Sequence, residues 1–232
     1  MECIVLAGGL GTRLRNTIGD LPKCMAEVNG KPFLQYLLEY LQAQQVTRVV
    51  LSLGYKHDVI TDWLRTRDFG FDVAHVIENE PLGTGGGIQL AMKAATEEHV
   101  FVVNGDTMFE VNLVNALEFH VSHKAETTLA LKPMQQFSRY GSVIIDESAT
   151  ISSFEEKRHC EDGLINGGVY AIDRKRFLQR ALPEKFSFET DYLGRYVSEH
   201  KFFGFVSSSY FIDIGVPEDY QKVQTDFKTR IS

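Results

Sequence analysis

The segment "CIVLAGGLGTRLRNTIGDLPKCM", residues 3–25, passes from an apolar run into a glycine-rich stretch. The apolar run at residues 3–7 is typical of a short buried β-strand. The glycines after it let the backbone turn tightly and let its N–H groups approach a ligand without an intervening side chain. Arg13, with its planar guanidinium, and Lys23, with its mobile ammonium, can offset the charge of a phosphate. We interpret the segment as a strand that leads into an anion-binding loop.

Two common phosphate-binding motifs do not match this stretch. Reading G-x-G-x-x-G from Gly9 puts Leu14 where the third glycine of a dinucleotide-binding fingerprint belongs. A Walker A loop needs Gly-Lys-Ser or Gly-Lys-Thr after four residues, and that sequence does not follow here. A nest of backbone N–H groups fits the stretch, and a tight strand–helix turn with surface charges stays open as the alternative.

The spacing of apolar residues predicts an alternation of strands and helices in the first half of the chain. The expected strands lie at 3–7, 48–53, 71–77 and 99–106, and the expected helices lie at 32–44, 57–67 and 86–96. The run at 100–103 is apolar on both faces, as in a central parallel strand. Such an alternation implies right-handed crossovers, so we predict an α/β, Rossmann-like fold with a mostly parallel sheet and helices on both faces.

The second half of the chain is richer in strands. They are expected at 126–133, 141–146, 150–156 and 165–173, with few helices between them. No linker or low-complexity tract divides the halves. We therefore predict a single domain, 1–232, in which residues 111–232 form a β-rich extension of the sheet built by residues 1–110.

Composition and charge exclude several classes of partner. The 232 residues are 44% hydrophobic, enough for one full core. Lys and Arg number 24 against 31 Asp and Glu, a net charge of −7 that gives no general attraction for nucleic acid or an anionic membrane. No apolar run reaches the roughly 18 residues of a membrane span. The three cysteines are widely spaced without a CxxC pair, and no signal peptide is visible. We expect a cytoplasmic protein.

Two aspartates stand where parallel strands are expected to end. Asp106, in "NGD", follows the apolar run at 100–103, and Asp213, in "YFIDIGVPEDY", follows another apolar strand. Ligands of open α/β sheets bind in the crevice at this edge. Either aspartate alone could equally cap a turn or helix. Two carboxylates beside a phosphate-binding loop, however, are the set that Mg²⁺ uses, so we predict a Mg²⁺ site formed by Asp106 and Asp213.

Seven motifs spread over residues 6–220 carry a family resemblance: "LAGGLGTRL…PKCM…VNGKPFLQY", "PLGTGGG", "NGD", "FEEK", "NGGVY", "FSFETD" and "FIDIGVPEDY". Together and in this order they resemble the sugar-1-phosphate nucleotidyltransferases. The resemblance implies a GT-A-like nucleotidyltransferase fold and transfer of a nucleoside monophosphate from an NTP to a sugar 1-phosphate, with release of pyrophosphate. Within the family, the sequence is most similar to enzymes that transfer guanylate to D-glycero-α-D-manno-heptose 1-phosphate. Mannose-1-phosphate guanylyltransferases and sugar-1-phosphate uridylyltransferases stay as alternatives, and a homo-oligomer stays open.

The resemblance also assigns roles, with nucleotide binding in 1–110 and sugar-phosphate binding in 111–232. The catalytic residues would be Arg13, Lys23 and Asp106, and the Mg²⁺ ligands Asp106 and Asp213. The nucleotide would be bound by Leu6, Ala7, Gly8, Gly9, Gly11, Thr12, Arg13, Lys23, Gly83, Thr84, Asn104 and Asp106. The sugar phosphate would be bound by Gly105, Glu156, Lys157, Asn166, Gly168 and Glu189.

Three points within these motifs leave alternatives open. Strict strand alternation would place Glu155, not Glu156, on the face of Lys157. Thr190 stands where the family often has a basic residue, and Arg158 where it commonly has proline.

A non-catalytic nucleotide-sugar sensor is the alternative from another functional class, but we expect such a protein to lack one of the four residues Arg13, Lys23, Asp106 and Asp213.

Overall fold

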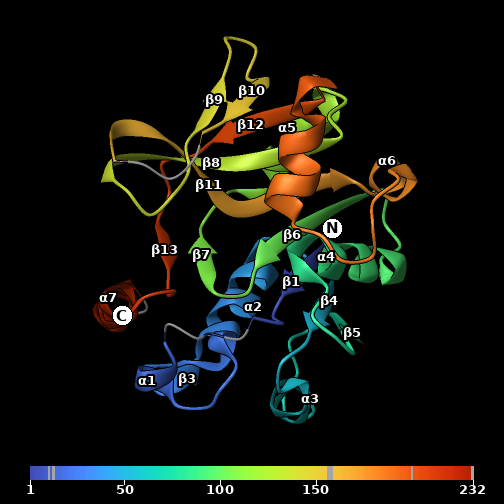
Figure 1. Cartoon of the computed structure of the whole chain (residues 1–232). Helices are drawn as coiled ribbons and strands as arrows, with labels where there is room; N and C mark the ends of the chain where they lie inside the picture. Colours follow the sequence, from blue (N-terminus) through green and yellow to red (C-terminus); the bar gives the residue numbers. More distant parts are fainter. Residues whose placement is uncertain (10, 12–13, 156–158, 200, 231–232) are drawn as a thin grey trace.

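A seven-stranded sheet runs through the computed structural model, which describes residues 1–9, 11, 14–155, 159–199 and 201–230 (Figure 1). The strand order is β12-β8-β11-β6-β1-β4-β5. Their bounds are β1 (Glu2–Leu6), β4 (Arg48–Leu53), β5 (Asp72–Ile77), β6 (His99–Asn104), β8 (Thr127–Phe137), β11 (Cys160–Asp173) and β12 (Phe202–Val206). Strand β11 is antiparallel to β6 and β8, while the other pairings are parallel. The prediction of a mostly parallel α/β sheet is confirmed.

Apolar side chains on both faces of β1 hold the helices against the sheet. Cys3 and Val5 belong to the core under helix α2 (Phe33–Ala43), and Ile4 belongs to the core under helix α4 (Gly83–Ala94). A strand buried on both faces favours apolar residues at successive positions, which is why the run from Cys3 to Leu6 is continuous. The remaining helices are α1 (Arg15–Ile18), α3 (His57–Leu64), α5 (Leu113–Ser122), α6 (Arg174–Gln179) and α7 (Pro217–Arg230).

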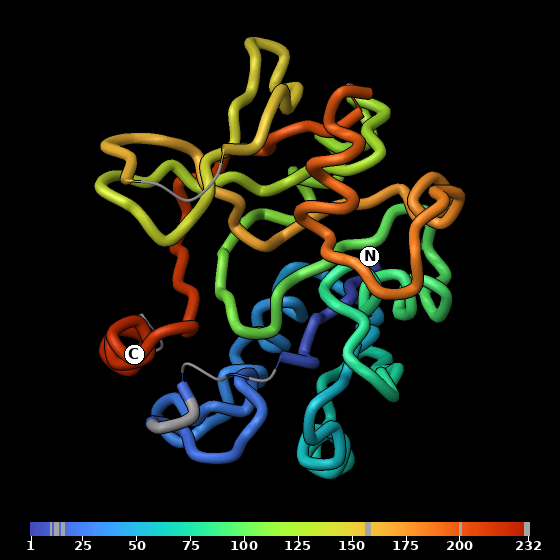
Figure 2. The backbone as a smooth tube through the Cα atoms, viewed as in Figure 1, coloured from blue at the N-terminus to red at the C-terminus, as the bar shows by residue number. Residues whose placement is uncertain are grey.

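Small antiparallel pairs complete the fold. They are β2 (Glu27–Val28) with β3 (Lys31–Pro32), β9 (Val143–Ile145) with β10 (Ile151–Phe154), and β7 (Thr107–Phe109) with β13 (Phe211–Asp213). The C-terminal helix α7 returns to the N-terminal region (Figure 2), where the Asn29 backbone N–H donates to Gln224 Oε1 over 3.0 Å. In the part of the chain that the structure describes, no helix is long and apolar enough to cross a bilayer.

The helix predicted at 86–96 begins three residues earlier, at Gly83, and ends at Ala94. The prediction included Gly86 and Gly87 in the helix but left Gly83, Thr84 and Gly85 outside it, whereas these three residues form the first turn of α4. Glycine is needed in this part of the helix because side chains would not fit there. A Cβ on Gly85 would lie 2.1 Å from the Phe186 ring, and one on Gly86 would lie 2.4 Å from the Glu184 carbonyl oxygen. The glycines thus allow the helix to pack closely against residues 184–186.

The four strands expected in the second half follow one another as β8, β9, β10 and β11 with no helix between them, as predicted. Helices α5, α6 and α7 and the short π-helix Phe188–Gly194 flank these strands, and no bounds were predicted for them. Their stability comes from packing: Leu113, Phe177, Phe188 and Phe227 are all buried against the sheet or its neighbours. The expected strands at 141–146 and 150–156 are shorter in the structure, and those at 126–133 and 165–173 are longer.

Candidate active site

Asp106 and Asp213 lie side by side at the carboxyl end of the central strands. Asp106 is in the turn between β6 and β7, and Asp213 ends β13, where it pairs with Thr107 in the antiparallel ladder. The Ile214 backbone N–H also donates to the Asp106 carbonyl oxygen over 3.0 Å. The β7–β13 pair therefore places two carboxylates, far apart in sequence, at one edge of the sheet.

Lys23 contacts both carboxylates. Its Nζ lies 2.5 Å from Asp106 Oδ2 and 3.3 Å from Asp213 Oδ1. Lys23 begins the 3₁₀ helix Lys23–Met25 directly after Pro22, whose ring restricts the backbone φ angle. Only 13% of the Lys23 side chain is exposed. Burial raises the pKa of Asp213, Lys23 opposes that rise with its positive charge, and Asp106 adds to it with a like charge.

The donor set around these aspartates suits Mg²⁺. Asp213 Oδ1 accepts the Gly215 backbone N–H over 2.8 Å, and Asp106 Oδ1 accepts the Thr107 hydroxyl over 3.2 Å. In the described residues, no third His, Cys, Asp or Glu joins them as a metal ligand. Mg²⁺ commonly takes one or two protein carboxylates and completes its octahedron with phosphate and water, so the residues present fit that ion.

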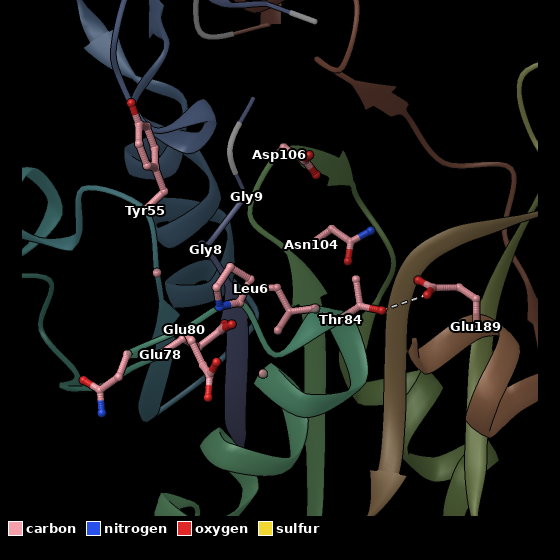
Figure 3. Close-up of a pocket in the computed structure, with 15 residues that line it drawn as sticks. Leu6, Gly8, Gly9, Tyr55, Glu78, Glu80, Thr84, Asn104, Asp106 and Glu189 are labelled. Atoms are coloured by element: carbon pink, nitrogen blue, oxygen red, sulfur yellow. Dashed lines mark hydrogen bonds between the residues drawn. The ribbon is translucent and has the colours of Figure 1, made fainter. Parts of the chain in front are cut away.

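A cavity of about 570 Å³ opens beside Asp106 at the ends of β1, β4 and β6 (Figure 3). Glu78 and Glu80 lie toward one end of it and Glu189 toward the other. Of the residues predicted to bind nucleotide, the cavity is lined by Leu6, Gly8, Gly9, Gly83, Thr84, Asn104 and Asp106. Glycine is required at Gly83, where φ is +75° and a Cβ would lie 2.6 Å from the Phe186 carbonyl oxygen.

The other predicted nucleotide residues lie elsewhere or are not described. Ala7 is buried, and Gly11 packs on Lys23, whose Cβ would lie 3.2 Å from a Cβ at that glycine. Ala7, Gly11 and Lys23 are not part of the cavity wall. Thr12 and Arg13 lie outside the described residues, as do Glu156 and Lys157 of the sugar-phosphate set.

The residues of the cavity wall that were not singled out from the sequence include Tyr55 and Glu78. Glu78 holds the start of α4, because its Oε2 accepts the Leu82 N–H over 3.1 Å. The Tyr55 hydroxyl donates to Asp20 Oδ1 over 2.5 Å, which ties the loop after β4 to the segment that follows the glycine-rich stretch. Both residues follow strands of the parallel sheet, so applying the carboxyl-edge rule to β4 and β5 would have found them.

A second cavity, of about 920 Å³, adjoins the first, and Asn104 and Glu189 line both. Asp213 lies on its wall, with Asn166 and Gly168 of the predicted sugar-phosphate set. The register of β11 shifts between Asn166 and Tyr170, so the glycines form a bulge. Gly168 has a φ of +70°, and a Cβ there would lie 2.5 Å from Asn104 Nδ2.

Glu189 and Glu155 line the second cavity, and Gly105 does not. Glu189 lines both cavities and accepts the Thr84 hydroxyl over 2.8 Å (Figure 3). Gly105 is buried and donates its N–H over 2.9 Å to the carbonyl oxygen of Leu6, a residue of the first cavity's wall. Glu155, the residue favoured by strand alternation, lines the cavity and accepts the Ser142 hydroxyl over 2.9 Å.

Comparison with known proteins decides the family. Residues 2–230 match the family model described as nucleotidyl transferase. The chain belongs to the nucleotidyl transferase family. The motif-based prediction of the family is therefore confirmed.

This nucleotidyltransferase is similar over nearly its whole length to three described proteins. It is 49% identical over 228 residues to a D-glycero-alpha-D-manno-heptose 1-phosphate guanylyltransferase of Aneurinibacillus thermoaerophilus, covering 98% of this chain and 99% of that one. It is 45% identical over 220 residues to the Campylobacter jejuni protein of the same name, with 95% and 97% coverage. The crystal structure of HddC from Yersinia pseudotuberculosis complexed with GMP-PN is 41% identical, with a TM-score of 0.86 over 97% of this chain and 99% of that one.

Proposed function

We propose that this nucleotidyltransferase transfers GMP from GTP to D-glycero-α-D-manno-heptose 1-phosphate, which yields GDP-heptose and pyrophosphate. The names of the Aneurinibacillus and Campylobacter relatives, at 49% and 45% identity, support these substrates, and the GMP-PN complex of the Yersinia protein supports a guanine nucleotide. The observation that carries the proposal is the junction of the two cavities. Asp106 lies on the wall of the first cavity and Asp213 on the wall of the second. Lys23 contacts both aspartates.

The reaction needs positioning and charge neutralisation more than a protein nucleophile. An oxygen of the sugar phosphate forms a bond to the α-phosphorus of GTP, the bond from that phosphorus to the bridging oxygen breaks, and its electron pair leaves with pyrophosphate. The sugar phosphate is already an anion at neutral pH, so in-line attack requires no general base. Cys24, beside Lys23, is buried, and burial raises the pKa of its thiol to about 12, which makes it unsuitable as a nucleophile.

Lys23 and the aspartates take complementary roles in this proposal. Lys23 offsets negative charge on the transferring phosphate and on the departing pyrophosphate. Asp106 and Asp213 hold Mg²⁺, which neutralises phosphate charge when it is bound. Among the predicted catalytic residues, Arg13 lies outside the described part of the chain, and its assignment to the same phosphates comes from the sequence motif.

The sugar is the part of the proposal that has a close competitor. A heptose carries one more hydroxymethylene group than mannose, beyond C6. A site that hydrogen-bonds the additional hydroxyl can discriminate strongly between the two sugars. A site that only leaves room for one more carbon gives a ratio of kcat/KM values of about 10 to 200. Asn166, Thr190 and Glu155 supply polar groups to the second cavity. We therefore expect the heptose 1-phosphate to be the better substrate.

The test is a matrix of nucleotides and sugars. Pyrophosphate release is measured with GTP, UTP and CTP, each against heptose 1-phosphate, mannose 1-phosphate and an N-acetylated sugar 1-phosphate. We expect the highest kcat/KM for GTP with heptose 1-phosphate. A higher kcat/KM with mannose 1-phosphate than with heptose 1-phosphate would overturn the assignment of the sugar. A higher kcat/KM for UTP with the N-acetylated sugar 1-phosphate would overturn the assignment of both substrates.

A further inference from the structure

Arg139 carries the positive charge on the wall of the second cavity. It lies in the loop between β8 and β9, in "FSRYG", which no motif of the sequence analysis includes. Among the described residues that line this cavity, the other charged ones are Glu155, Glu189 and Asp213. A sugar 1-phosphate that enters the cavity would meet three carboxylates. Its phosphate therefore needs a cation, and Arg139 is the cation that the described wall supplies.

The Arg139 side chain is held next to the strand that ends at Asp213. Its guanidinium carbon lies 5.6 Å from the centre of the Tyr140 ring. The Tyr140 ring in turn meets the Phe211 ring edge-on, with centroids 5.9 Å apart and planes at 77°. Phe211 begins β13 and Asp213 ends it. Two aromatic contacts thus link Arg139 to β13, whose last residue, Asp213, lines the same cavity.

Asp219, in the first turn of α7, pairs with Arg139 in this structure. The exposed fractions of the two side chains are 47% for Arg139 and 21% for Asp219. Ion pairs that are open to water contribute little to stability because solvent screens them. The guanidinium can therefore exchange Asp219 for another anion at low cost. Its planar fork of donors matches a phosphate, which can accept two parallel hydrogen bonds.

We propose that Arg139 binds the phosphate of the sugar 1-phosphate, and that Asp219 is the partner of its guanidinium when the sugar phosphate is absent. The proposal rests on the proposed function and deepens it, because it assigns a substrate contact in the same site. It differs from a purely structural role, in which the pair with Asp219 would serve only to anchor α7.

Steady-state kinetics of the full chain separate the two roles. With GTP saturating and the sugar 1-phosphate varied, Arg139→Gln should raise KM for the sugar 1-phosphate by roughly 10-fold or more, as expected for a lost hydrogen bond to a charged group. KM for GTP should stay near the wild-type value. The KM of Arg139→Lys for the sugar 1-phosphate should lie between those of the wild type and Arg139→Gln, since lysine keeps the positive charge but lacks the planar guanidinium. Arg65→Gln is the matched control, because Arg65 is an exposed arginine directly after α3 that pairs with Asp62.

The variant Asp219→Asn tests the second half of the proposal. Without its resting partner, Arg139 should bind the sugar phosphate as well as or better than in the wild type, so KM for the sugar 1-phosphate should be unchanged or lower. The proposal is overturned if Asp219→Asn reproduces the defect of Arg139→Gln, because both changes would then act by releasing α7. It is also overturned if Arg139→Gln leaves KM for the sugar 1-phosphate unchanged, as it would if Lys157 alone bound the phosphate.

Failure of the proposed substrates would be seen separately. Wild-type protein that releases no pyrophosphate from GTP with heptose or mannose 1-phosphate would overturn the substrate assignment. Arg139 is then tested by calorimetric titration of the wild type and Arg139→Gln with the sugar 1-phosphate that gives the highest activity in the substrate matrix. Equal affinities of the two proteins would overturn the role of Arg139.

Discussion

The Nζ atom of Lys23 lies 2.5 Å from Asp106 Oδ2, although Lys23 follows the glycine-rich stretch and Asp106 lies in the turn after β6. Asp213 Oδ1 lies 3.3 Å from the same Nζ. An ammonium held by two carboxylates is oriented without substrate. In the proposed function, Asp106 and Asp213 would hold Mg²⁺, and Lys23 would offset the charge of the phosphates. These roles are the basis of the first two predictions.

Asp106→Asn should remove most of the nucleotidyltransferase activity while the thermal midpoint stays close to that of the wild type. An amide is a weaker ligand for Mg²⁺ than a carboxylate, and Lys23 keeps its contact with Asp213, so the fold loses little. Pyrophosphate release at several Mg²⁺ concentrations and a thermal melt measure the two effects. Asp62→Asn, an exposed aspartate of α3, is the control. Near wild-type turnover in Asp106→Asn would contradict the metal assignment.

Lys23→Ala should lower kcat far more than it raises KM for the sugar 1-phosphate. Loss of a donor that stabilises charge in the transition state typically raises the activation free energy by about 2–4 kcal/mol, and we expect a rise of that size for Lys23→Ala. Steady-state kinetics with both substrates varied provide the measurement. A change confined to KM would mean that Lys23 binds the ground state and transition state equally, and it would remove the residue from the catalytic set.

His120 should make the fold sensitive to acid. Its ring is buried, and its Nδ1 lies 2.9 Å from the Thr128 hydroxyl. Burial first, and then His99 with its charge, lowers the pKa of His120 from 6.5 to about 4. The unfolded chain therefore takes up a proton at a higher pH than the folded protein does. Stability from the neutral ring is fully present above pH 6.5 and is lost as the pH falls toward 4, by about 3 kcal/mol in total.

Thermal melts between pH 7 and pH 4 test this prediction. His120→Leu cannot be protonated, so its midpoint should fall less steeply over that range than the midpoint of the wild type. His75→Leu, at an exposed position of β5, should retain the wild-type slope. Parallel curves for the wild type and His120→Leu would show that other groups cause the loss of stability in acid.

Gly85→Ala should destabilise the protein by about 1–3 kcal/mol, because the new methyl group would overlap the Phe186 ring. Gly9→Ala is the matched change, since a Cβ there would meet no atom of the described residues within 4 Å. We expect Gly9→Ala to keep the free energy of unfolding near that of the wild type. Chemical denaturation of both variants gives the comparison, and equal stabilities would mean that Phe186 moves aside without cost.

Local sequence was sufficient for the features that depend on short segments. Apolar runs and helical spacing predicted β1, α2, β4 and β6, because a strand buried on both faces or an amphipathic helix leaves a periodic pattern in the residues themselves. The position of Asp106 after such a run predicted its place at the carboxyl edge of the sheet. The motifs, taken together, predicted the family.

Tertiary structure alone decided which side chains meet. The contact of Lys23 with two aspartates depends on the pairing of β7 with β13, and the place of Arg139 depends on the aromatic contacts of Tyr140 and Phe211. The early start of α4 at Gly83 depends on the approach of residues 184–186. None of these relationships leaves a local pattern, because each is set by the packing of segments that are distant in sequence. Periodicity reports which face of an element is buried, and it carries no information about the partner that buries it.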